Sequence, residues 1–185
     1  MSPLKGLQCL ILILMFYPAV ALNTTICEMC HCQDNVVDCS AQLGDLHKLP
    51  KNIPNDTDTL DVSFNQIEFI GNILYNLPVL WKLTVTNNTI ATQYGLPSSL
   101  TSLYGQNNKL TDIFGMFNNT IHIEIVDLTN NNISSIENGT FFNCDRLVHL
   151  DLSYNPLVRL QDGAFTGLSH LRKLQVSLFG FLKLK

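Results

Sequence analysis

Residues 148–160 read VHLDLSYNPLVRL, and the pattern in this stretch decides the fold. Leu150 and Leu152 alternate with other residues, as the apolar residues of a half-buried strand do. Asn155 follows three positions after Leu152, and Leu157 stands two positions after that asparagine. A polar residue held at a fixed distance between apolar ones indicates a repeated unit, in which the same spacing recurs along the chain.

The same spacing recurs upstream. Written as Leu-x-x-Leu-x-Leu-x-x-Asn-x-Leu with aliphatic exchange, the pattern fits residues 80–90, 123–133 and 147–157. Residues 57–67 and 100–110 fit with one exception each, Thr57 at the first apolar position and Gly105 at the third. A sixth copy begins at Leu171 but has Phe179 where the asparagine is due. The asparagines are Asn65, Asn88, Asn108, Asn131 and Asn155, separated by steps of 23, 20, 23 and 24 residues.

These steps and this consensus resemble the leucine-rich repeat family, and the resemblance covers roughly residues 57–176. It implies an α/β-type leucine-rich repeat solenoid, with a curved parallel sheet on the concave side and irregular convex segments. Where each coil turns sharply out of its strand, backbone N–H and C=O groups face the interior without partners. An asparagine amide offers two donors and an acceptor, so we expect stacked copies to satisfy these groups. The alternative, five surface turn asparagines, fits the fixed spacing poorly.

Two convex segments are long enough to align position for position. Ile136, Gly139, Phe141 and Cys144 correspond to residues 24 positions later, which are Leu160, Gly163, Phe165 and Leu168. Cys144 therefore stands in a buried apolar slot, where a free cysteine behaves as a small hydrophobe rather than a reactive group. The other convex segments are shorter and less regular, and no helix is assigned to them.

The first 21 residues predict a secretory signal peptide. Lys5 precedes an apolar run from Cys9 to Tyr17, and Ala19-Val20-Ala21 forms a cleavage site. A signal anchor is the alternative, but nine apolar residues fall short of the ~20 needed to span a bilayer. Cleavage removes Lys5 and moves the formal net charge from −4 to −5. This acidic balance argues against nucleic acid or anionic membrane as a partner, and no other segment reads as a transmembrane span.

Four cysteines precede the first repeat, at Cys27, Cys30, Cys32 and Cys39. They resemble the disulfide-bonded amino-terminal cap of extracellular leucine-rich repeat proteins, because a solenoid otherwise exposes an apolar end. The resemblance implies the pairs Cys27–Cys32 and Cys30–Cys39. A zinc site that includes His31 is the rival interpretation, and an oxidising compartment favours disulfides. The domain boundaries that follow are 1–21 for the signal peptide, 22–56 for the cap, 57–176 for about six repeats and 177–185 for a non-repeat tail.

Six Asn-x-Ser/Thr sequons behind a signal peptide suggest a glycoprotein. They are Asn23, Asn55, Asn87, Asn118, Asn132 and Asn138.

The family resemblance implies that ligands bind to the outward positions of the strands, which line the concave side. Alternation turns one residue of each Leu-x-Leu outward, namely Asp61, Thr84, Tyr104, Asp127, Asp151 and Gln175. Phe64, Lys82 and Tyr154 lie beside them. Acidic residues with interleaved aromatics suit a basic protein or peptide surface. The alternative is a hydrophilic face that only keeps the molecule soluble.

Enzymatic activity is not expected, and no cofactor is implied. His149, Asp151 and Ser153 have the membership of a hydrolase triad. Residues two positions apart on a strand are about 6.6 Å apart, beyond the roughly 2.6–3.2 Å of a nucleophile and its base.

The sequence therefore predicts a secreted or extracellular module that binds a protein ligand or receptor, similar to Toll-type receptor ectodomains in immune or developmental recognition. The alternative is an extracellular-matrix protein similar to small leucine-rich proteoglycans. Because residues 177–185 lack the cysteines of a carboxy-terminal cap, self-association through the last coil is also expected.

Overall fold

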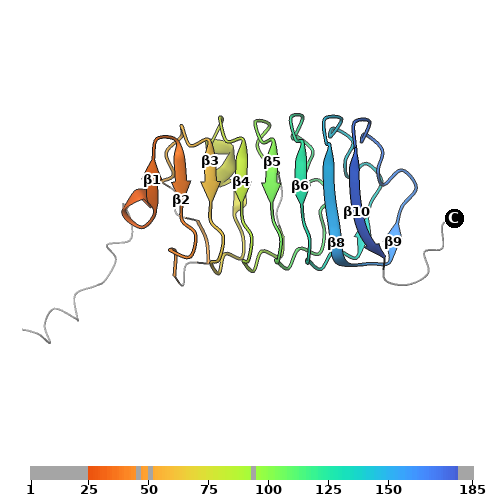
Figure 1. Cartoon of the computed structure of the whole chain (residues 1–185), viewed down its shortest axis with the longest axis horizontal. Coiled ribbons are helices and arrows are strands. Elements are labelled where there is room, and N and C mark those ends of the chain that lie inside the picture. Colours follow the sequence, from red (N-terminus) through yellow and green to blue (C-terminus); the bar gives the residue numbers. More distant parts are fainter. Residues whose placement is uncertain (1–24, 45–46, 50–51, 93–94, 179–185) are drawn as a thin grey trace, which may run out of the picture.

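Short parallel strands, one from each repeat, form a single sheet along the long axis of the molecule (Figure 1). The computed structural model describes residues 25–44, 47–49, 52–92 and 95–178. The predicted signal peptide, the Asn23 sequon and all but the start of the predicted tail lie outside these ranges. The strands of the repeats are β3 (Thr59–Asp61), β4 (Lys82–Thr84), β5 (Ser102–Tyr104), β6 (Ile125–Asp127), β8 (His149–Leu157) and β10 (Lys173–Leu178).

The strands pair in the register that the repeat predicts. Leu60 pairs with Leu83, Leu83 with Leu103, Leu103 with Val126, and Val126 with Leu150. These five side chains are almost completely buried. Since equivalent residues of successive coils are neighbours, the apolar positions of the repeat form continuous buried rows, and the predicted parallel-sheet solenoid is confirmed.

The amino-terminal cap adds two strands to the same sheet. After a 3₁₀ turn, η1 (Ile26–Glu28), strands β1 (His31–Gln33) and β2 (Val36–Asp38) form an antiparallel hairpin, and β2 pairs in parallel with β3. Disulfides join Cys27 to Cys32 and Cys30 to Cys39, the pairs that the family resemblance implies. All four thiols are consumed, so they provide no thiolate ligands for zinc.

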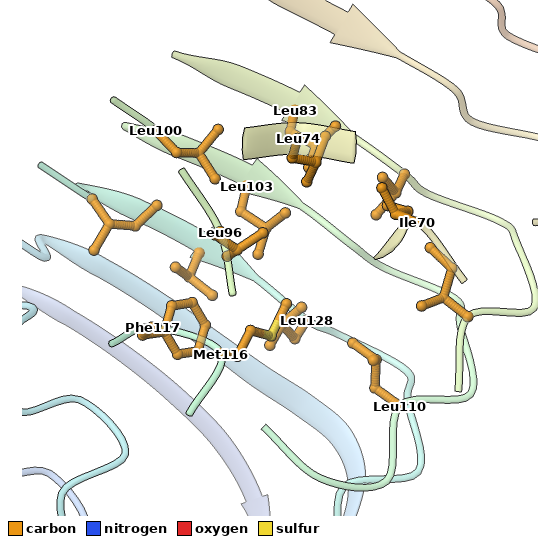
Figure 2. Close-up of a cluster of buried hydrophobic side chains, with 14 of the residues drawn as sticks. Ile70, Leu74, Leu83, Leu96, Leu100, Leu103, Leu110, Met116, Phe117 and Leu128 are labelled. Atoms are coloured by element: carbon orange, nitrogen blue, oxygen red, sulfur yellow. The ribbon is translucent and has the colours of Figure 1, made fainter. Parts of the chain in front are cut away.

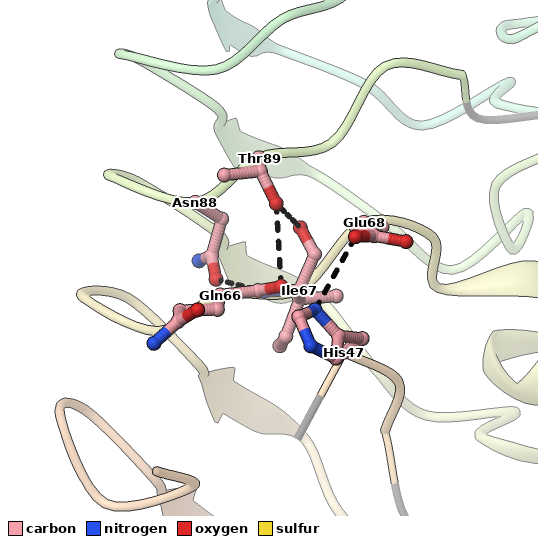
Figure 3. Close-up of polar contacts among 6 residues, drawn as sticks. All are labelled: His47, Gln66, Ile67, Glu68, Asn88 and Thr89. Atoms are coloured by element: carbon pink, nitrogen blue, oxygen red, sulfur yellow. Dashed lines mark hydrogen bonds and ion pairs between the residues drawn. The ribbon is translucent and has the colours of Figure 1, made fainter. Parts of the chain in front are cut away.

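Each ladder asparagine bonds to its own coil and to the preceding one, as expected. Asn88 accepts the N–H of Ile67 at 2.9 Å (Figure 3) and donates to the carbonyls of Val62 at 2.9 Å and Val85 at 3.0 Å. The same bonds recur at Asn65, Asn108, Asn131 and Asn155. Thr89 adds a side-chain bond to the carbonyl of Ile67 at 3.2 Å. The coils are therefore joined by side chains as well as by the sheet.

The convex connections are more ordered than the sequence predicts. A 3₁₀ helix, η2 (Gly71–Asn76), occupies one segment to which no helix was assigned, so that part of the prediction is wrong. Strands β7 (Ser135–Ile136) and β9 (Arg159–Leu160) form a second, two-stranded parallel sheet. These elements depend on neighbouring coils, which a single segment of sequence does not reveal. Among the described residues, no helix has the length and apolar character needed to cross a bilayer.

The two aligned convex segments pack as their alignment predicts. The equivalent rings of Phe141 and Phe165 stack with their centroids 6.2 Å apart, and the ring of Phe117 from the preceding coil lies 5.4 Å from that of Phe141. Cys144 is a free, buried cysteine, and burial raises the pKa of its thiol to about 11. A thiol with this pKa is protonated at neutral pH, so Cys144 serves the core and is no nucleophile.

A small apolar cavity marks the repeat that has glycine at its third apolar position. It lies among Leu96, Leu103, Met116 and Leu128, which point toward one another in Figure 2. Its volume is about 10 Å³ and its lining exposes no polar surface, so it offers a water molecule no partner. A methyl group built on Gly105 meets the Leu128 Cδ2 atom at 2.9 Å and the Val85 Cγ2 atom at 3.6 Å. A methyl group at Gly105 is therefore too close to Leu128 for ordinary contact, and it fits only if the end of the Leu128 side chain moves into the adjoining cavity.

We expect Asn131→Leu to lower the free energy of unfolding by about 3 kcal/mol or more. The substitution leaves the N–H of Leu110 unpaired in the interior, and the carbonyls of Gly105 and Leu128 each lose one of the two amide donors that they share between coils. Urea denaturation measures the loss. The matched control, Asn119→Leu, changes an exposed asparagine, and an equal loss there would contradict the role of the ladder.

We expect Gly105→Ala to raise the free energy of unfolding by about 0.4–1 kcal/mol, because alanine restricts the unfolded chain and partly fills the cavity. Leu128 presents the flexible end of its side chain and moves aside. Gly167→Ala is the control: Gly167 has a φ of +101°, and its methyl group would lie 2.3 Å from the carbonyl of Phe141. Thermal denaturation should shift in opposite directions for the two variants, and destabilisation by Gly105→Ala would refute this account.

Candidate functional site

The sheet brings the outward residues of successive strands into one row. Pairing places Asp38, Asp61, Thr84, Tyr104, Asp127, Asp151 and Gln175 side by side in that order. Six of these seven are the positions that alternation in the sequence predicts. Asp38 was missed because it belongs to the cap, although it follows Val36 and Val37 at the spacing of a strand. Lys82 lies in the neighbouring row, between Thr59 and Ser102.

The aspartates of this row accept hydrogen bonds that stabilise the backbone bends after their strands. Asp61 Oδ1 accepts the N–H of Ser63 at 2.8 Å, and Asp127 Oδ1 accepts the N–H of Thr129 at 3.0 Å. Asp38 and Asp151 accept the equivalent N–H groups at 2.9 Å. Hydrogen bonds from the side chain and backbone of Ser40 lower the pKa of Asp38. The carboxylates thus contribute to the turn after each strand.

The prediction that Asp151 is an exposed contact residue is therefore wrong. Its relative exposure is only 9%, whereas its neighbours in the row, Asp127 and Gln175, are half-buried. Asp61 and Asp127 are half-buried. A carboxylate in this position accepts a hydrogen bond within the coil and has limited access to solvent. Acidic groups are therefore not the most exposed groups of this face.

The centre of the face carries a connected set of polar side chains. Thr86 donates to Gln106 Oε1 at 2.7 Å, and Gln106 donates through Nε2 to Asp127 Oδ2 at 2.7 Å. Lys82 Nζ lies 5.8 Å from the centroid of the Tyr104 ring, within the range of a cation–π contact. The sequence did not single out Thr86 or Gln106, because their bonds join residues about one repeat apart.

A second row, which we call the turn row, follows the bends. It consists of the residue before each ladder asparagine: Phe64, Asn87, Asn107, Asn130 and Tyr154. All five have left-handed backbone conformations, with φ between +54° and +56°. Asparagine tolerates this conformation, whereas bulky residues rarely adopt it. Nevertheless Phe64 and Tyr154 occupy it with exposed rings, at 62% and 70% of their full accessibility.

The residues considered for catalysis do not form a triad. Asp151 Oδ1 bonds to the backbone N–H of Ser153 rather than to His149. The Nε2 atom of His149 is buried and has no hydrogen-bond partner among the described residues. Within the described ranges, no three or more His, Cys, Asp and Glu residues are grouped so as to hold a metal ion.

The five sequon asparagines that the structure describes lie outside the core. Asn55, Asn118, Asn132 and Asn138 are exposed, and Asn87 is half-buried in the turn row. A glycan on any of the four exposed amides would project into solvent.

An open groove of about 380 Å³ lies beside the amino-terminal ends of β6, β8 and β10. Its charged lining residues are Glu124, Asp145, Arg146 and Arg172, and His170 lies among them. Because the lining contains both carboxylates and guanidinium groups, the groove presents no single sign of charge.

Comparison with known proteins identifies the repeat. Residues 98–157 and 121–178 match the family model described as "Leucine rich repeat". The leucine-rich repeat-containing protein 3 of Danio rerio is 37% identical over 70 residues, which are 35% of this chain and 26% of that protein. The chain thus spans about a quarter of this curated relative.

Three solved structures share the fold. A chain in the crystal structure of the TLR13–ssRNA13 complex has a TM-score of 0.56 and 24% identity, over 76% of this chain and 25% of that one. A chain of the octameric complex of Latrophilin 3 (Lec, Olf), Unc5D (Ig, Ig2, TSP1) and FLRT2 (LRR) has a TM-score of 0.62 and 21% identity, over 80% and 56%. YopM from Yersinia enterocolitica WA-314 has a TM-score of 0.53 and 25% identity, over 75% and 29%.

Proposed function

The chain is a leucine-rich repeat protein with a disulfide-bonded cap, and we propose that it is a secreted or extracellular module that binds a protein ligand in receptor-like recognition. Two disulfides in the cap support an oxidising compartment, because such bonds form and persist there. The predicted signal peptide and the exposed sequon asparagines agree with that compartment.

The observation that carries the proposal is the pair of exposed aromatic rings in the turn row. Phe64 and Tyr154 occupy backbone positions that three equivalent coils fill with asparagine. The left-handed conformation costs an ordinary residue about 1–2 kcal/mol, and neither ring recovers this cost by burial. Folding alone therefore does not account for these two side chains. Strained, exposed aromatics are typical of contact sites.

The spacing of the two rings indicates the size of the partner. Four strand intervals separate them, from β3 to β8, which corresponds to about 19 Å at ~4.8 Å per strand. One small molecule does not span both rings, whereas a protein surface of ordinary size does. Tyr104 and Lys82 lie on the strands between them. We take this face, from Phe64 through Tyr104 to Tyr154, as the ligand-binding surface.

The chemistry of the turn row favours a partner without strong charge. Its members are two aromatic rings and three amides, and the Asn130 side chain donates to Asn107 Oδ1 at 2.7 Å. This favours an uncharged protein surface over a nucleic acid, for which phosphate binding would call for basic residues. We therefore propose an uncharged protein surface in place of the basic surface that the acidic strand residues suggested.

We expect Phe64→Asn combined with Tyr154→Asn to weaken partner binding at least tenfold while raising the free energy of unfolding by about 1 kcal/mol. Asparagine relieves the left-handed strain and removes the rings. Binding of the mature protein to an array of purified extracellular protein domains, followed by surface plasmon resonance on each hit, measures the first effect, and urea denaturation measures the second.

Phe114→Asn serves as the matched control, because Phe114 is exposed on a convex segment and has no positive φ. It should leave binding unchanged. Partners that bind the double variant as tightly as the wild type would exclude this face.

The free end of the sheet supports the expectation of self-association, which we retain as a proposal. Strand β10 pairs with β8 on one side and with no described strand on the other. Leu174, whose equivalents in earlier coils are buried, is 44% exposed. Unpaired edges with apolar residues template association.

We expect the purified mature chain to form dimers or larger species at micromolar concentration, and Leu174→Lys to shift it toward monomer. Size-exclusion chromatography with light scattering decides this. Val79→Lys changes an exposed valine in the segment before β4, far from this edge, and should have no effect. A wild-type monomer would show that the end is already sealed.

A further inference from the structure

One threonine hydroxyl is buried without any hydrogen bond. Thr57 is completely buried, and its Oγ1 atom has no partner among the described residues. It occupies the first apolar position of its repeat, which the other copies fill with Leu80, Leu100, Ile123 and Leu147. Burying an unpaired hydroxyl weakens the folded state by roughly tenfold in the folding equilibrium, whereas a methyl group in its place would contribute to the core.

Other buried threonines of this chain keep their hydroxyl groups bonded. Thr120 donates to the carbonyl of Phe117 at 2.9 Å, and Thr140 donates to the carbonyl of Glu137 at 2.9 Å. These two hydroxyls close turns, so they have a use in the folded protein. Thr57 has no such bond, and its hydroxyl calls for an explanation outside the folded state.

The sequence around Thr57 supplies that explanation. Asn55-Asp56-Thr57 is an acceptor sequon, in which the hydroxyl two positions after the asparagine is required for N-linked glycosylation. Asn55 and Asp56 are exposed in the folded protein, so a glycan on Asn55 meets no obstacle. Of the three residues of this sequon, only Thr57 is buried, so its hydroxyl group is inaccessible in the folded protein.

We propose that the Thr57 hydroxyl serves the unfolded chain, and that Asn55 receives an N-linked oligosaccharide before the first coil closes over Thr57. This inference rests on the proposed secretion of the protein. In the transfer, Asn55 Nδ2 attacks the first carbon of an oligosaccharide carried on a lipid diphosphate. The new bond joins nitrogen to that carbon, the carbon–oxygen bond to the diphosphate breaks, and the lipid diphosphate leaves with the electron pair. The amide proton passes to a basic group of the oligosaccharyltransferase.

Three other threonine sequons have hydroxyl groups that are hydrogen-bonded in the folded protein. Thr120 and Thr140 complete the sequons of Asn118 and Asn138, and both are buried. Thr89 completes the sequon of Asn87, and its hydroxyl bonds to the carbonyls of Gln66 and Ile67 at 3.2 Å. These three hydroxyl groups therefore have a role in the folded protein, so among these four sequons only that of Thr57 allows the requirement of modification to be tested apart from the requirement of folding.

A transfer reaction with defined components tests the order of events. The mature chain, made without glycans and oxidised, is incubated with purified oligosaccharyltransferase and a lipid-linked oligosaccharide, either folded or reduced and unfolded. Mass spectrometry of the peptide that contains Asn55 should show at least tenfold higher occupancy on the unfolded chain. Equal occupancy on the folded chain would overturn the proposal. This assay requires neither secretion nor a protein partner, so its outcome is independent of the proposed function.

Variants at Thr57 test the reason for the hydroxyl. Thr57→Val should abolish the glycan at Asn55 on the secreted protein, and should lower the unfolding equilibrium constant of the unglycosylated protein about tenfold. Thr57→Ser should retain the glycan. Thr120→Val and Thr140→Val are the matched controls, and both should raise the unfolding constant because each removes a bonded hydroxyl. A Thr57→Val protein that unfolds more readily than the wild type would show that the hydroxyl serves the folded state.

Discussion

The structure depends on the hydrogen bonds that each ladder asparagine makes to two coils at once. Asn155 illustrates them: it accepts the N–H of Ile133 at 3.0 Å and donates to the carbonyl of Leu128 in the preceding coil at 2.9 Å. Most strands contain only three residues and supply few bonds between coils. The asparagines pair the backbone groups that the sharp turns would otherwise leave unpaired in the interior. They also hold successive coils in register, which is what aligns the outward residues into rows.

The positions where this chain departs from the demands of its own repeat are the informative ones. The turn before each ladder asparagine requires a left-handed residue, yet Phe64 and Tyr154 occupy that position with exposed rings. The first apolar position requires an aliphatic side chain, yet Thr57 buries an unpaired hydroxyl there. Each of these residues makes the folded state less stable than a simpler residue would. We propose recognition as the reason for the aromatic pair, and modification of the unfolded chain as the reason for the threonine. Gly105 departs from the pattern too, at a position where a side chain would meet that of Leu128.

The acidic residues of the sheet face show that a side chain on the outward side of a strand can also have a structural role. Alternation correctly puts Asp61 and Asp127 on the outward side of their strands. Each carboxylate then accepts an N–H group two residues later, because a short acidic side chain at the end of a strand reaches that group easily. One oxygen of each carboxylate is therefore already hydrogen-bonded within its own coil. The exposed chemistry of the face comes instead from aromatic rings and amides of the next row.

The sequence by itself determined the repeat, its register, the rows of buried leucines and the role of the five asparagines. These follow from spacing along the chain, and the disulfide pairs were implied by a family resemblance. Only the tertiary structure decided the burial of Asp151, the bonds from Thr86 through Gln106 to Asp127, and the small sheet of β7 and β9. It also showed which buried threonine lacks a partner. Each of these features depends on contacts between residues about one repeat apart in the chain, and such contacts exist only once the coils have stacked.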